Sequence, residues 1–236
     1  MNRLILLAIL LLPTVSLADA DLSARLPAIG CQGSQPSCAA WAVTYAKGMM
    51  WGKRFSPAYI YNLRDLYPRT CDEDKGMSVG NAMRLAKSGC ALWGEFLYDD
   101  TDPCTIPELT DQYRTEETTL LFGKQGDADL DVLKSWLDRG FPVVSTIPLY
   151  MDYYACRCGY AMNGPKHWYS SPTGWHVILI VGYDDLGFKF VNSQGEDWAC
   201  GGFGWMTEAF VQEYVFEGWV MLEEYPYQVC IPLVAQ

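Results

Sequence analysis

Basic residues are scarce in this sequence. It contains 17 Lys and Arg against 28 Asp and Glu in 236 residues, which gives a formal net charge of −11. This balance argues against nucleic acids and anionic membrane surfaces as partners. Internal repeats and low-complexity tracts are also missing, and 14% of the positions are aromatic, too many for a disordered chain. We therefore expect one globular unit that is a monomer.

Long apolar runs are lacking as well. The longest covers nine residues, 4–12, whereas a helix needs about 20 to cross the hydrocarbon core of a bilayer. The run follows Arg3 and is closed by Pro13 and the small residues of 16–20, as in a secretory signal peptide. We expect residues 1–18 to be a signal peptide and the protein to be secreted or periplasmic. No cysteine stands near the cleavage site to take a lipid, so no membrane anchor is expected.

Cysteine, in contrast, is plentiful. Nine cysteines in an exported chain suggest disulfides, and the odd number leaves at least one thiol unpaired. They stand at positions 31, 38, 71, 90, 104, 156, 158, 200 and 230. A free thiol in an oxidising compartment requires a reason.

Helical patterns come first along the chain and strand patterns come later. Serines at suitable N-cap positions and apolar residues at helical spacing mark the helices, and short apolar runs bounded by turn residues mark the strands. We expect helices at 37–50, 56–66, 78–87 and 129–139, and strands at 142–147, 177–181, 188–192 and 219–222. The polar region 99–126 is expected to be the crossover between two lobes. This order indicates an α+β fold with a cleft between the lobes.

Only two histidines, His167 and His176, are available for acid–base chemistry near neutral pH. His167 lies among Gly, Pro, Ser and Asn residues, which is typical of a surface loop. His176 is followed by five apolar residues, where an imidazole is costly to bury unless its nitrogens are hydrogen-bonded. A core histidine with satisfied nitrogens is the alternative, but His176 is the better catalytic candidate.

Cys38 stands in the first turn of the first expected helix. The helix dipole and the unpaired N–H groups there lower the pKa of a thiol and favour the thiolate, which is the nucleophile. A buried or disulfide-bonded cysteine is the alternative. Gln32, six residues earlier (38 − 32), is close enough to donate to an oxyanion at the attacked carbonyl. Asn192 lies sixteen residues beyond His176 (192 − 176), one strand along.

Three segments of the sequence carry the candidate residues, in a fixed order along the chain. The first is Gln32-Gly33-Ser34-Gln35-Pro36-Ser37-Cys38-Ala39-Ala40-Trp41-Ala42, the second is residues 175–184 around His176, and the third is Asn192-Ser193-Gln194-Gly195 with Trp198, Gly202 and Phe203. Together they resemble the nucleophile, histidine and asparagine segments of the papain family of cysteine peptidases. Residues 133–144 are similar to the helix and strand that open the second lobe in bacterial members. The resemblance covers nearly all of residues 30–222.

The resemblance implies a papain-like two-lobed α+β fold. Its helical left lobe would span about 30–125 and its antiparallel, sheet-rich right lobe about 126–225, with the active site in the cleft between them. After the signal peptide, residues 19–236 would form one catalytic domain. Cleavage after residue 18 would leave 218 residues (236 − 18), too few for that domain and a long inhibitory prosegment.

The family's site residues carry over to this sequence position by position. Cys38 would be the nucleophile that forms a thioester, His176 the base and acid, and Asn192 the residue that orients the imidazole. Gln32 and the backbone N–H of Cys38 would form the oxyanion hole. Three residues would bind substrate: Gly76, Met77 and Trp175. The substrate would be a peptide or protein, and no cofactor would be needed.

Two positions depart from the family pattern beside the site. Ala39 and Gln194 stand where the family usually has tryptophan. The second of these tryptophans shields the His–Asn hydrogen bond, so Gln194 could weaken that bond by up to ~1 kcal/mol. A papain-fold amidase or acyltransferase acting on a non-protein amide, and a catalytically weakened binding protein, are therefore the alternative functions.

The resemblance also bears on the remaining cysteines. Cys71 and Cys104 occupy positions similar to one disulfide of the family, and the eight cysteines other than Cys38 permit four disulfides with one free thiol. Sequence alone cannot choose among the 15 pairings of the other six. A zinc site at Cys156 and Cys158 with His167 is disfavoured by export and by the lack of a fourth ligand, so we expect no metal.

Overall fold

The computed structural model describes residues 19–64, 75–165 and 171–222. The expected signal peptide, His167, Cys71 and Cys230 lie outside these residues. None of the helices in these ranges is both long and apolar enough to cross a membrane.

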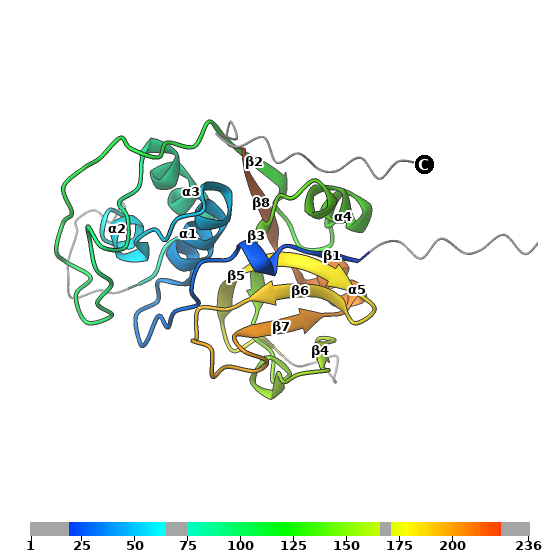
Figure 1. The fold of residues 1–236 in the computed structure, drawn as a ribbon. Coiled ribbons are helices and arrows are strands. Elements are labelled where there is room, and N and C mark those ends of the chain that lie inside the picture. Colours follow the sequence, from blue (N-terminus) through cyan, green and yellow to red (C-terminus); the bar gives the residue numbers. More distant parts are fainter. Residues whose placement is uncertain (1–18, 65–74, 166–170, 223–236) are drawn as a thin grey trace, which may run out of the picture.

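Three helices gather on one side of the sheet: α1 (Cys38–Trp51), α2 (Pro57–Asn62) and α3 (Val79–Ser88) (Figure 1). Ser56 and Ser78 cap α2 and α3, since each side chain accepts a backbone N–H three residues later. Ser37 occupies the N-cap position of α1, but its side chain does not cap the helix. Its hydroxyl is instead hydrogen-bonded to that of Tyr98 at 2.6 Å.

An eight-stranded sheet forms the other part of the molecule. Seven strands follow the order β2-β8-β3-β5-β6-β7-β4, and β1 pairs with β5 outside this path. The strands are β1 (Ala20–Asp21), β2 (Glu117–Phe122), β3 (Val143–Pro148), β4 (Ala161–Met162), β5 (Trp175–Asp184), β6 (Gly187–Val191), β7 (Phe203–Met206) and β8 (Glu217–Leu222). All pairs are antiparallel except β4 with β7.

Strand β5 is buried on both faces, which explains its continuous apolar run. Val177, Leu179 and Val181 belong to the core shared with α1, α2 and α3. Ile178 and Ile180 belong to a second core on the opposite face. That second core also takes in side chains of α4 (Leu130–Asp138) and α5 (Glu208–Tyr214). Strand β5 therefore contributes side chains to both hydrophobic cores, one shared with the helical half and one on the other face of the sheet.

The start of the described chain is held against the sheet. Residues 20 and 21 pair with Tyr183 and Gly182, and a Cβ at Gly182 would lie 2.1 Å from the carbonyl oxygen of Ala20, so only glycine fits there. The short helix η1 (Ser23–Arg25) follows. Arg25 then donates to the carbonyls of Gly140 at 2.7 Å and Met49 at 3.1 Å, which connects the sheet half to α1.

The sequence-based α+β assignment and most of its elements are confirmed. The second helix is shorter than expected and ends at Asn62. The strand expected at 177–181 is longer than expected, because β5 runs from Trp175 to Asp184. Strands β1, β2, β4 and β7 and helix α5 were not anticipated, and β2 lies inside the region expected to be the crossover. The lobe boundary near residue 125 stays a prediction, but β2, which precedes it, already pairs with β8 in the sheet.

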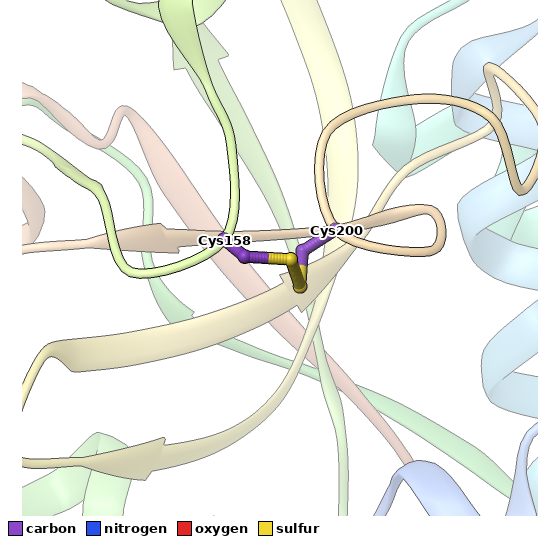
Figure 2. The surroundings of a disulfide bond; sticks show 2 residues. All are labelled: Cys158 and Cys200. Atoms are coloured by element: carbon purple, nitrogen blue, oxygen red, sulfur yellow. A yellow bond between two sulfur atoms is a disulfide. The ribbon is translucent and has the colours of Figure 1, made fainter.

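The expected disulfide framework is wrong in part. Cys31, Cys90 and Cys156 are free thiols, as Cys38 is, so the described chain carries more than one unpaired cysteine. Cys158 and Cys200 form a disulfide between the segment before β4 and the loop before β7 (Figure 2). Cys104 is disulfide-bonded, but its expected partner Cys71 lies outside the described residues.

Candidate active site

Cys38 and His176 meet where α1 packs on β5. Cys38 is the first residue of α1, and His176 is the second residue of β5. The thiol and the imidazole are hydrogen-bonded to each other. His176 is only 6% exposed, whereas Cys38 is partly accessible at the edge of a cleft. The structure thus brings a thiol and a base together in a position that a substrate can reach.

The two groups shift each other's pKa in opposite directions. Burial raises the pKa of the Cys38 thiol, but the hydrogen bond and charge of His176 lower it. The backbone N–H groups of Val177 and Ala39 lower it further, and the pKa lies below its ordinary value. Burial lowers the pKa of His176, but the hydrogen bonds to Cys38 and Asn192 and the thiolate charge raise it above its ordinary value. The arrangement therefore favours a thiolate–imidazolium pair.

Asn192 directly follows β6 and lies against the imidazole. Its Oδ1 is 2.7 Å from Nε2 of His176 and accepts the backbone N–H of Ser193 at 2.8 Å. Its Nδ2 donates to the hydroxyl of Tyr153 at 2.8 Å. With 1% of its surface exposed, the amide is fully enclosed by these contacts.

Gln32 is connected to the asparagine segment. Its backbone N–H donates to the carbonyl of Ser193 at 2.7 Å, and its Oε1 accepts from the Ser193 hydroxyl. Its Nε2 donates one hydrogen to the carbonyl of Gln35 at 2.8 Å and has a second hydrogen left. The loop before the nucleophile and the segment after β6 therefore form one hydrogen-bonded unit.

A cleft of about 550 Å³ opens beside Cys38 and His176. The three residues expected to bind substrate, Gly76, Met77 and Trp175, all line it. Trp175 is 53% exposed and stacks edge to face on Phe216, with ring centroids 5.8 Å apart. The remaining lining residues are Pro36, Lys75, Ser78, Val79, Thr146, Val177 and Glu217. The cleft is thus formed by the loop before α3 on one side and by strands β3, β5 and β8 on the other.

Sequence reasoning missed Tyr153, Phe216 and Glu217. Tyr153 lies in the short helix η2 (Tyr153–Ala155), within a stretch that carries no periodic pattern. Glu217 is the first residue of β8 and Phe216 precedes it, and both lie before the part of the strand that was predicted. The aromatic pair Tyr153-Tyr154 was the only signal in the first of these segments.

Within the described ranges, no group of three or more His, Cys, Asp or Glu side chains is arranged to hold a metal ion. Cys158, a ligand of the alternative zinc site, is in a disulfide.

No family model and no curated protein matches the sequence. Among solved structures, xylellain, a cysteine protease from Xylella fastidiosa, is 22% identical with a TM-score of 0.73, and the match covers 87% of this chain and 85% of xylellain. Digestive procathepsin L2 proteinase from Tenebrio molitor larval midgut is 19% identical, with a TM-score of 0.68 and coverages of 87% and 68%. The bromelain protease from Ananas comosus, in complex with the E64 inhibitor, is 13% identical, with a TM-score of 0.69 and coverages of 87% and 99%.

These likenesses establish the fold. The chain has the mixed α+β architecture of the papain-like cysteine peptidases, as its sequence motifs predicted.

Proposed function

We propose that the protein is an exported cysteine peptidase that hydrolyses peptide bonds through Cys38, His176 and Asn192. The observation that carries this proposal is the continuous hydrogen-bonded chain from the Cys38 thiol through the imidazole to the Asn192 amide, at the edge of a cleft of about 550 Å³. The peptidase fold supports it independently.

In the first half of the reaction, the thiolate of Cys38 attacks the carbonyl carbon of the scissile bond. The carbonyl oxygen becomes an oxyanion, which the backbone N–H of Cys38 and the second amide hydrogen of Gln32 stabilise. The imidazolium of His176 then protonates the leaving nitrogen, the C–N bond breaks, and the acyl group stays on sulfur as a thioester.

In the second half, neutral His176 takes a proton from water. The resulting hydroxide attacks the thioester carbonyl, and the carboxylic acid leaves as the C–S bond breaks. Asn192 accepts from the Nε2–H of His176 throughout, which keeps the other ring nitrogen, Nδ1, toward sulfur.

Export is part of the proposal and rests on different observations. Residues 1–18 have the composition of a signal peptide, and the Cys158–Cys200 disulfide suits an oxidising compartment. Sequencing the N-terminus of protein recovered outside the cytoplasm tests it. We expect the chain to begin at residue 19 or 21, and an intact residue 1 would contradict export by this route.

A digest of a denatured peptide mixture tests the catalytic part. The purified protein should generate fragments, and its Cys38→Ala variant should generate none above background. Labelling by an epoxide-type thiol inhibitor is measured alongside. Labelling without cleavage would indicate an amidase or acyltransferase acting on another amide, and absence of both would indicate a binding protein.

A further inference from the structure

Tyr153 makes two contacts with the His176–Asn192 pair. Its hydroxyl accepts a hydrogen bond from Nδ2 of Asn192 at 2.8 Å, and its ring lies edge to face against the imidazole, with centroids 5.6 Å apart. The residue is buried, with only 6% of its surface exposed. A buried tyrosine normally satisfies its hydroxyl, and here the partner is the amide that orients the proposed base.

The amide of Asn192 has only one orientation that satisfies its neighbours. The backbone N–H of Ser193 is a donor only, so the atom facing it must be Oδ1. The same Oδ1 faces His176, which places the proton of that contact on Nε2. Nδ2 then needs an acceptor in a fully buried place, and the hydroxyl oxygen of Tyr153 provides it.

The hydrogen bond between imidazole and amide is shielded from water, since His176 is 6% and Asn192 1% exposed. The ring of Tyr153, which contacts the imidazole, also packs on Trp198 with centroids 5.4 Å apart, and Trp198 packs on Phe190 at 5.9 Å. Excluding water lowers the local dielectric and strengthens the bond between imidazole and amide.

The segment that carries Tyr153 is tied to the loop that carries Trp198. The Cys158–Cys200 disulfide connects the two, five residues after Tyr153 (158 − 153) and two after Trp198 (200 − 198) (Figure 2). The disulfide thus joins the two segments whose aromatic rings, Tyr153 and Trp198, pack on each other.

We propose that Tyr153 is a positioning residue, which holds Asn192 in the orientation that accepts from His176 and keeps water from their hydrogen bond. This inference rests on the proposed function, in which an imidazolium is required. Burial raises the pKa of the Tyr153 hydroxyl, so it stays neutral and able to accept through the working range of a peptidase. The other titratable groups near this network are Cys38 on α1, and Cys156 and Tyr154 beside Tyr153.

The test compares Tyr153→Phe and Tyr153→Leu with the matched control Tyr154→Phe. Tyr154 is the neighbouring tyrosine, 59% exposed, and its hydroxyl contacts Thr173 and not Asn192. Tyr153→Phe leaves the ring but removes the acceptor, so kcat should fall about threefold to tenfold with KM nearly unchanged. The alkaline limb of the pH profile should move down by roughly half to one pH unit, because the imidazolium loses support. Tyr153→Leu, which also removes the ring, should lower kcat further. Tyr154→Phe should change neither kcat nor the alkaline limb.

A second readout does not need turnover. The rate of Cys38 alkylation by iodoacetamide, followed against pH, reports the same thiolate–imidazolium pair, and Tyr153→Phe should move its alkaline transition in the same direction. Unchanged profiles in both Tyr153 variants would overturn the inference even if the protein is a peptidase. A protein that cleaves no peptide but shows the shifted alkylation profile would retain the inference and lose the proposed substrate class. An ordinary thiol profile in the unaltered protein would overturn both.

Discussion

Cys31 and Gln194 face each other in an isolated antiparallel β-bridge. This bridge joins the loop before the proposed nucleophile to the segment after Asn192, and backbone hydrogen bonds on either side extend it, from Gln32 to Ser193 and from Gly195 to Gly30. Both segments therefore keep a fixed position relative to one another. The bridge also brings an exposed free thiol, that of Cys31, close to the site.

Selective alkylation separates the reactive thiol from the others. At pH 6, brief iodoacetamide treatment should modify Cys38 first, because its pKa is lowered by the hydrogen bond and charge of His176. Burial raises the pKa of Cys90 to about 12 and that of Cys156 to about 12, so both should react slowly. Peptide mass mapping gives the order of reaction. Faster modification of the exposed Cys31 would contradict the assignment of Cys38 as the nucleophile.

The number of free thiols is a direct check of the disulfide pattern. Denatured, non-reduced protein should titrate at least four thiols, because Cys31, Cys38, Cys90 and Cys156 are all unpaired. The measurement is a colorimetric thiol assay in strong denaturant, with the fully reduced chain and its nine cysteines as the reference. A single thiol per chain would restore the pairing expected from the cysteine count alone.

The pH dependence of kcat/KM should be bell-shaped around neutrality. The pKa of Cys38 is lowered from 9.0, so the acid limb should lie below that value, where the thiol loses its proton. The pKa of His176 is raised from 6.5, so the alkaline limb should lie above that value, where the imidazolium loses its proton. Both groups carry their charges between the two limbs. Activity that rises only as pH reaches 9.0 would show that no ion pair forms.

Trp175→Ala should weaken substrate binding more than chemistry. The indole lines the cleft, is half exposed and stacks on Phe216, so it offers a large apolar surface to a peptide. Its loss should raise KM about fivefold to tenfold with little change in kcat, on a scale of ~1 kcal/mol for an aromatic contact. Leu186→Ala, an exposed apolar residue in the turn after β5, serves as the control. An equal fall of kcat in both variants would point to a general loss of structure.

Removing the Cys158–Cys200 disulfide should lower stability. The bond closes a loop with a sequence separation of 42, for which the chain-entropy estimate is about 4 kcal/mol. Urea unfolding of the Cys158→Ser, Cys200→Ser double variant measures the loss, and Cys156→Ser, which removes a neighbouring free thiol, is the control. If the double variant unfolds at the same urea concentration as the control, the disulfide does not constrain the unfolded chain as assumed.

Local chemistry made much of the fold predictable. The serines at 56 and 78 marked two helices and the helical spacing of apolar residues at 130, 133, 136 and 137 marked a third, because each signal acts within a few residues. Strands β4 and β7 were missed because their partners are distant in sequence: residues 161 and 162 pair with 205 and 206. The cap at Ser37 was misjudged for the same reason, since its competing partner, Tyr98, is 61 residues away.

The same distinction applies to the candidate site. Cys38, His176 and Asn192 could be predicted because they stand in short segments with a characteristic residue pattern. Tyr153 could not, because its contact with Asn192 depends on how η2 folds back over the end of β6. The free thiols were also unpredictable, since pairing depends on the distance between side chains and not on the number of cysteines.

The position of β5 between the two hydrophobic cores has a consequence for when the site can form. Cys38 and His176 are 138 residues apart in the chain (176 − 38), and they meet only after α1 has docked on a strand that is itself flanked by β3 and β6. Long-range contacts of this kind form late in folding, because the entropy cost of closing a large loop comes before the contacts lower the free energy. In an unfolded chain the thiol of Cys38 is therefore separated from the imidazole of His176. If the chain is exported unfolded, as proposed, the pair would form only where the protein folds, and the topology would delay the proposed chemistry until then.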